Sequence, residues 1–127
     1  MIKKKILVVD DNLDSCLMLG TILKLENFEV EITESTSIAL IKIETSPPDA
    51  VITDYRMPDM DGCQFLQHIR ASNKHMPVFI VNGIDQEYLR DTAPQCINQI
   101  SAFIPKPVDP DSLVEIVKKV LNFTDVA

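Results

Sequence analysis

Charged side chains stand directly after three short apolar runs of this chain: Asp10 and Asp11 after 5–9, Asp54 after 50–53, and Lys106 after 102–105. Runs this short and this rich in valine and isoleucine predict strands that are buried on both faces of a parallel sheet. In an open parallel sheet, the ligand site lies outside the carboxyl ends of the strands. The sequence therefore predicts that three carboxylates and one ammonium group share a single crevice.

The rest of the chain alternates between strand-like and helix-like segments. Further strands are predicted over 28–33, near an edge of the sheet, and over 78–81. Helices are predicted over 14–26, over 37–45, from Gly62 onward, over an irregular stretch of about 85–100 that contains Pro94, and after a capping Asp109. Asn27 is predicted to end the first helix in a left-handed conformation. Five strand–helix units in this order indicate a three-layer, doubly wound α/β domain.

The first predicted helix carries apolar residues on two faces. Leu13 and Leu17 lie outside the stripe formed by Met18, Leu19 and Ile22. We expect them to contribute additional core packing.

Length and composition restrict the possible functions. A chain of 127 residues fits one domain, and its net charge of −7 argues against nucleic acid as a direct partner. No apolar stretch approaches the ~20 residues of a membrane span, and no signal peptide is recognisable, so we expect a cytoplasmic protein. Cys16, Cys63 and Cys96 show no metal-binding spacing and are expected to be reduced thiols.

The predicted crevice suits a magnesium ion and a phosphoryl group. Asp10, Asp11 and Asp54 would raise one another's pKa unless a cation neutralised them, and hard oxygen ligands suit Mg²⁺. Asp54 could then act as a nucleophile that forms an aspartyl-phosphate. Lys106 would supply positive charge to the phosphoryl oxygens.

Three motifs resemble those of response-regulator receiver domains, the phosphoacceptor modules of two-component signalling: ILVVDD at 6–11, DYRMPDMDG at 54–62, and PKP at 105–107. The resemblance covers essentially the whole chain. It implies a single receiver domain over 1–127 without an output domain. The implied fold is flavodoxin-like: a (βα)5 domain with a five-stranded parallel sheet in strand order 2-1-3-4-5.

The resemblance also implies a role for each site residue. Asp54 would be phosphorylated, and Mg²⁺ would be held directly by Asp11, by Asp54 and by the backbone carbonyl of Arg56, with Asp10 acting mainly through water. Lys106 would contact the phosphoryl group and precede a cis peptide bond to Pro107. The donor would be a phosphohistidine on a histidine kinase or a histidine phosphotransfer protein. The chain would catalyse only its own phosphorylation and dephosphorylation, and would regulate a partner protein that the sequence does not specify.

Some positions depart from the family pattern. Asn82 and Gly83 stand where the family usually has Ser or Thr followed by Ala, so the phosphoryl contact at position 82 would come from an amide. Phe103 occupies the aromatic switch position. The altered segment that follows Gly83 leaves open a specialised partner, or a homodimer formed through the 82–121 face.

Two alternative functions remain at this point. One is a docking module of the same fold that signals without phosphate, which the departures at Asn82 and in the following segment favour. The other is a magnesium-dependent phosphohydrolase with an aspartyl nucleophile. Such enzymes usually place a second acid two residues after the nucleophile, and this chain has Arg56 there.

Overall fold

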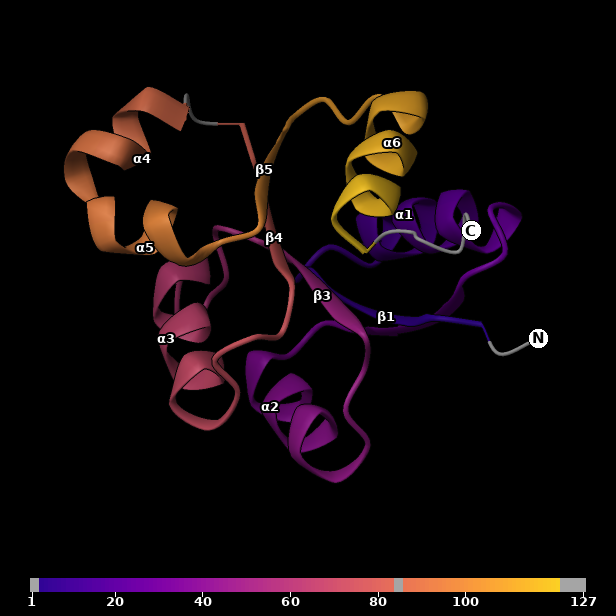
Figure 1. Ribbon diagram of the computed structural model, residues 1–127, viewed down its shortest axis with the longest axis horizontal. Coiled ribbons are helices and arrows are strands. Elements are labelled where there is room, and N and C mark those ends of the chain that lie inside the picture. Colours follow the sequence, from indigo (N-terminus) through magenta and orange to yellow (C-terminus); the bar gives the residue numbers. More distant parts are fainter. Residues whose placement is uncertain (1–2, 84–85, 122–127) are drawn as a thin grey trace.

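Five parallel strands form the centre of the computed structural model, which describes residues 3–83 and 86–121 (Figure 1). They are β1 (Lys5–Val9), β2 (Glu29–Thr33), β3 (Ala50–Asp54), β4 (Val78–Asn82) and β5 (Ala102–Pro105). Their order in the sheet is β2-β1-β3-β4-β5. This order confirms the predicted flavodoxin-like fold. All residues of β3 and β4 are buried, whereas β2 lies at an edge and is mostly half-exposed, as its alternating sequence predicts.

The helices cover both faces of the sheet (Figure 1). They are α1 (Leu13–Leu25), α2 (Thr36–Thr45), α3 (Gly62–Ser72), α4 (Gln86–Thr92), α5 (Pro94–Gln99) and α6 (Pro110–Leu121). Successive strand side chains point to opposite faces, so the sheet contributes to two buried clusters. One cluster joins the sheet to α1 and α6, and the other joins it to α2, α3 and α5.

Side-chain caps set several helix boundaries. Asn12 accepts a hydrogen bond from the Ser15 amide at the start of α1, and Asp61 forms a capping box with Gln64 at the start of α3. Asn27 has a positive φ of 73° and ends the α1 region as predicted. Asp109 accepts a hydrogen bond from the Ser112 amide, which confirms the predicted cap before α6. These caps explain why the predicted boundaries lie close to the observed ones.

The irregular helical stretch predicted over about 85–100 consists of two short helices, α4 and α5. Pro94 is the first residue of α5, where its missing amide hydrogen carries no cost. The proline therefore separates two helices rather than bending one. The predicted first residue of this stretch, Asp85, lies outside the described residues.

The expectation for Leu13 and Leu17 is wrong. Their relative exposures are 48% and 50%, so neither adds to the core. One face of α1, with Cys16, Leu19 and Leu23, already fills the space against the sheet.

The expectation that the cysteines are reduced thiols is wrong for two of the three. Cys63 and Cys96, separated by 33 residues, form a disulfide bond, and Cys16 is a free, buried thiol. Cys63 lies in the first turn of α3 and Cys96 lies in α5. The pairing results from the packing of α5 against α3, which no cysteine spacing in the sequence indicates.

Candidate functional site

The charged residues predicted to share a crevice come from neighbouring strands. Asp10 follows β1 directly, and Asp54 is the last residue of β3, which pairs with β1. Asn82 ends β4 and is paired with Pro105 of β5, so that the Lys106 amide donates to the Asn82 carbonyl at 3.0 Å. Parallel pairing brings the carboxyl ends of these strands to one edge of the sheet.

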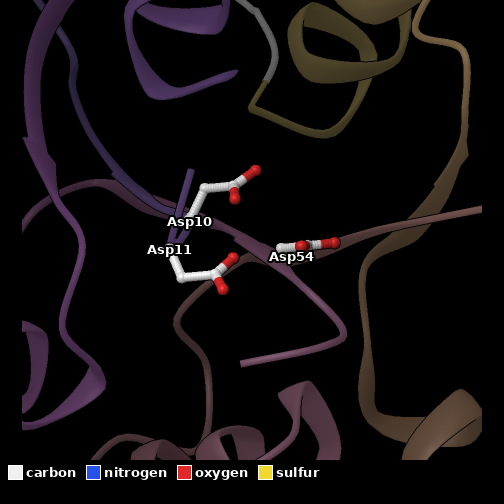
Figure 2. A group of neighbouring side chains, drawn as sticks. All are labelled: Asp10, Asp11 and Asp54. Atoms are coloured by element: carbon white, nitrogen blue, oxygen red, sulfur yellow. The ribbon is translucent and has the colours of Figure 1, made fainter. Parts of the chain in front are cut away.

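Three carboxylates gather at this edge. Asp10, Asp11 and Asp54 each offer an oxygen, and these oxygens all lie within 4.8 Å of one another. Figure 2 shows the Asp10 and Asp11 side chains extending toward Asp54. Asp10 and Asp54 are buried, with exposures of 2% and 7%, whereas Asp11 is exposed. The cluster is therefore buried at Asp10 and Asp54 and open to solvent at Asp11.

Burial raises the pKa of the Asp10 carboxyl above its ordinary value. The hydrogen bond from the Asn12 amide, at 2.9 Å, opposes this shift, while the negative charges of Asp54 and Asp11 add to it. An added cation would remove part of this repulsion between like charges.

Asp54 is held through one of its two oxygens. The Tyr55 amide donates to Oδ1 at 2.9 Å, and the Lys106 ammonium lies 3.1 Å from the same atom. Within residues 3–83 and 86–121, Oδ2 receives no hydrogen bond. This carboxylate is therefore oriented by one oxygen, and the other has no hydrogen-bond donor in the described part of the chain.

A pocket of about 350 Å³ opens beside Asp54 and is lined by Asp54, Arg56, Asn82, Gly83 and Lys106. Asn82 is only 4% exposed, and its Nδ2 is buried without a hydrogen-bond partner in the described part of the chain. An unpaired buried donor costs free energy unless a ligand satisfies it. The residues that line the pocket thus carry a carboxylate, an ammonium group and, on Asn82, a buried amide donor without a partner.

The backbone around Asp54 is held by the start of α3. The Gly62 amide donates to the Tyr55 carbonyl at 2.7 Å. A Cβ atom at position 62 would lie 3.1 Å from both the Asp54 carbonyl oxygen and the Tyr55 Cα. Glycine therefore allows α3 to begin in close contact with the strand end that carries Asp54.

Of the predicted site residues, Phe103 alone belongs neither to the carboxylate cluster nor to the pocket lining. Phe103 is half-buried on β5, where it is paired with Ile80, and it does not line the pocket. The Lys106–Pro107 peptide bond is cis, as the family resemblance implies.

Sequence reasoning missed one contact near the site. The fully buried Thr36, in α2, donates a hydrogen bond from its hydroxyl to the Asp59 carboxylate. This contact connects the loop after Asp54 to α2. No signal in the sequence pairs these two residues, because each of them alone resembles an ordinary helix-start or loop residue.

The donor set fits a magnesium ion. Three convergent carboxylate oxygens, one of them accessible to solvent, match the preference of Mg²⁺ for a few carboxylates with retained waters. Burial is the main cause of the raised Asp10 pKa, and the negative charges of Asp54 and Asp11 add to it; a divalent cation would offset this repulsion.

We predict that the affinity for Mg²⁺ falls when the pH is lowered from neutral to about pH 5. The fall should be larger than for a site whose carboxyl groups all have ordinary pKa values. The Asp10 pKa is raised above 3.8, so the native state takes up a proton that competes with the cation. Without metal, the Asp10 contribution to stability is present in acid and is lost as the pH rises through the native pKa. Calorimetric titration at several pH values tests this, with Asp10→Asn as the control. An equal pH dependence in wild type and Asp10→Asn would contradict it.

Comparison with known proteins identifies the family. The model of the response regulator receiver domain matches residues 6–118. The transcriptional regulatory protein ZraR of Salmonella typhimurium is 32% identical over 123 residues, which are 96% of this chain and 27% of that protein. A protein-glutamate methylesterase/protein-glutamine glutaminase of Trichodesmium erythraeum is 32% identical over 126 residues, covering 95% and 36% of the two chains. The structure of a CheY-like receiver domain protein from Methanospirillum hungatei has a TM-score of 0.85 at 30% identity, and the match covers 94% of each chain.

The chain belongs to the response regulator receiver domain family of two-component signalling systems. It spans about a quarter to a third of the length of these curated relatives.

Proposed function

We propose that this receiver domain is a phosphoacceptor switch that takes a phosphoryl group onto Asp54. The observation that carries the proposal is the arrangement around this carboxylate. Its Oδ1 is held by the Tyr55 amide and Lys106, and the pocket beside it is lined by Asn82, whose buried Nδ2 has no partner in the described part of the chain.

The reaction uses the chain's own residues in defined roles. Oδ2 of Asp54 attacks the phosphorus of a phosphohistidine, the bond from phosphorus to the imidazole nitrogen breaks, and its electron pair stays on the imidazole. Lys106 stabilises the negative charge that builds up on the phosphoryl oxygens. Asn82 donates a hydrogen bond from Nδ2 to one of those oxygens, which satisfies its buried donor.

We assign the magnesium ligands to Asp11, Asp54 and the backbone carbonyl of Arg56, with Asp10 acting through water. The ion would supply positive charge that lets an anionic donor approach three carboxylates. Beyond its own phosphorylation and dephosphorylation, the chain is proposed to catalyse no reaction.

The proposed partners follow from the same chemistry. The donor is a histidine kinase or a histidine phosphotransfer protein, and the phosphorylated domain regulates a further protein by binding it. The net charge of −7 makes direct nucleic-acid binding unfavourable. We propose that residues 1–127 constitute one receiver domain, that it acts in the cytoplasm, and that the 82–121 face is available for a second copy of the chain. Residues 1–2, 84–85 and 122–127 of this range are outside the described structure.

None of the helices in the described part of the chain is long and apolar enough to cross a bilayer.

The direct test is incubation with acetyl phosphate and Mg²⁺, followed by mass spectrometry of the intact protein. We expect the mass of one phosphoryl group to be added to wild type, and no addition in Asp54→Ala or in the presence of EDTA. If wild type gains no mass, even from a phosphorylated histidine kinase, the phosphate-independent docking module replaces this proposal. Multiple turnover of a phosphate ester would favour the phosphohydrolase, against which stands Arg56 at the position where such enzymes usually have a second acid.

We predict that Asn82→Thr strengthens the coupling between phosphorylation and partner binding. A hydroxyl can rotate to follow the phosphoryl oxygen, whereas the Asn82 amide is packed in place at 4% exposure. A charge-assisted hydrogen bond contributes about 1–3 kcal/mol, which corresponds to roughly fivefold to 150-fold. Because the Asn82 amide already supplies part of this, we expect the better-aligned hydroxyl to raise the coupling by roughly tenfold. The measurement is the affinity gain on phosphorylation in both forms, with Asn82→Ala as the control. Equal gains in wild type and Asn82→Thr would contradict the prediction.

A further inference from the structure

The Cys63–Cys96 disulfide joins two segments that flank the phosphoacceptor pocket. Cys63 follows Gly62, whose amide is bonded to the Tyr55 carbonyl directly after Asp54. Cys96 lies in the stretch of chain that connects Asn82 and Gly83 to β5 and Lys106. One sulfur thus belongs to the helix that holds the reactive strand end, and the other belongs to the segment between two pocket residues.

The segment that carries Cys96 has little internal stability. Helices α4 and α5 contain seven and six residues, and Ala93 at the start of α5 provides no side-chain cap. Helices of this length are marginal without tertiary contacts. The segment is held by the buried Leu89, by the disulfide, and by a hydrogen bond of 2.8 Å from the Arg70 guanidinium of α3 to the Gln99 carbonyl.

The disulfide is the covalent part of this attachment. Arg70 holds the end of α5 by a bond that can open and close, and its guanidinium also donates to the carbonyls of Asn73 and Met76. Breaking the sulfur–sulfur bond would leave α5 attached to α3 by noncovalent contacts alone. Local opening of the α4–α5 segment would then require less free energy.

We propose that Cys63 and Cys96 form a reversible redox pair, exchanged by a dithiol reductant, that sets how freely the α4–α5 segment opens from α3. The oxidised form holds the segment in place, and the reduced form releases it. Disulfides in cytoplasmic proteins are usually transient, catalytic or redox-sensing, so the cytoplasmic location proposed above, on which this step rests, favours this role over a permanent structural one. We expect the released α4–α5 segment to change its conformation more on phosphorylation than the attached one. This expectation rests on the proposed phosphorylation of Asp54.

The redox step balances with a dithiol as the electron donor. A thiolate of the reductant attacks one sulfur of the pair, the Cys63–Cys96 bond breaks, and a mixed disulfide forms. The second thiol of the reductant then displaces the protein sulfur. The reductant leaves as a disulfide, having given two electrons and two protons, and the protein retains two thiols. The reverse exchange with an oxidised dithiol closes the bond again.

The burial of the sulfurs determines how this exchange proceeds. Cys63 is 8% exposed and Cys96 is 5% exposed, so a reductant reaches the bond through small local fluctuations that expose one sulfur while α5 is still tied to α3. Cys16 is fully buried on the inner face of α1, in the cluster on the opposite face of the sheet, and is not a competitor for the pairing. The exchange is therefore confined to one pair of cysteines.

The first part of the test measures the redox pair in the intact, folded chain. The protein is equilibrated in mixtures of reduced and oxidised dithiothreitol, quenched in acid, and alkylated with iodoacetamide in denaturant. Of the three cysteines, we expect one alkylated residue in the oxidised protein and three in the reduced protein. Three free thiols under all conditions, or a bond that dithiothreitol reduces only in denaturant, would overturn the proposal.

The second part measures opening by hydrogen–deuterium exchange of the unphosphorylated protein. We expect amides in 86–100 to exchange at least about tenfold faster after reduction, with the central strands unchanged. The matched control is the double variant Cys63→Ser/Cys96→Ser, which should exchange fast with or without dithiothreitol. Identical exchange of wild type in both redox states would overturn the proposal.

The last part separates this proposal from the proposed function. Oxidised and reduced proteins are phosphorylated with acetyl phosphate, and the change in exchange over 86–100 is compared. A larger change in the reduced form would support the claim that reduction increases the response of the α4–α5 segment to phosphorylation. Equal changes in the two forms would overturn that claim. If neither form gains a phosphoryl group, the phosphoacceptor function fails, while the alkylation and exchange results for the redox pair stand independently.

Discussion

Replacing Lys106 by methionine should slow the phosphorylation of Asp54 by roughly tenfold to a hundredfold, which corresponds to about 1.4–2.7 kcal/mol of transition-state stabilisation. The ammonium lies 3.1 Å from Oδ1 of Asp54 and faces the pocket in which the phosphoryl group would bind. Loss of a preorganised charge at such a position costs up to about a thousandfold in enclosed sites. The Lys106 side chain is 37% exposed, so solvent screens part of its effect, and we expect the smaller value.

The measurement is the rate of phosphoryl incorporation from acetyl phosphate at saturating Mg²⁺. Two controls separate a chemical effect from misfolding. Lys106→Arg retains the positive charge and should retain more of the rate. Lys106→Met should also bind Mg²⁺ at least as tightly as wild type, because removal of a nearby cation makes the carboxylate cluster more negative. Wild-type rates in Lys106→Met would show that this lysine does not act on the phosphoryl group.

Reduction of the Cys63–Cys96 bond should lower the free energy of unfolding by about 3 to 4 kcal/mol, and the melting temperature by on the order of 10 °C. The bond closes a loop with a sequence separation of 33 residues. Its removal gives the unfolded chain the conformational freedom that this loop closure had restricted.

Urea unfolding with and without dithiothreitol measures this difference. The variant Cys63→Ser/Cys96→Ser serves as the control, since its stability should not depend on dithiothreitol. A redox difference of equal size in that variant would show that the effect does not come from this bond. Equal stability of oxidised and reduced wild type would contradict the prediction.

Much of the fold could be predicted because local signals agreed with the tertiary structure. The run at 5–9 became β1, and the apolar spacing of Gly62, Phe65, Leu66 and Ile69 became the buried face of α3. The capping residues gave boundaries that short-range hydrogen bonds enforce, so these boundaries did not depend on distant parts of the chain. Leu13 and Leu17 show where this reasoning failed, since apolar character does not reveal whether a neighbouring element has space to cover a side chain.

The site also combines features that the sequence predicted with features that only the structure revealed. The positions of Asp10, Asp11, Asp54 and Lys106 at strand ends followed from the sequence, because parallel strands bring their carboxyl ends to one edge. Their roles in magnesium binding and phosphorylation remain predictions. The unpaired Nδ2 of Asn82 and the contact between Thr36 and Asp59 became visible only in the structure, because both depend on what surrounds a side chain in space.

The sequence alone thus determined the order of strands and helices and the edge at which the charged side chains meet. These properties depend on periodicity and on the geometry of parallel strands, which act over short stretches of chain. The tertiary structure alone decided that Cys63 bonds to Cys96 and that α5 is attached to α3 beside the pocket. A disulfide depends on the distance and orientation of two side chains that are far apart along the chain, and only the packing of the helices sets these.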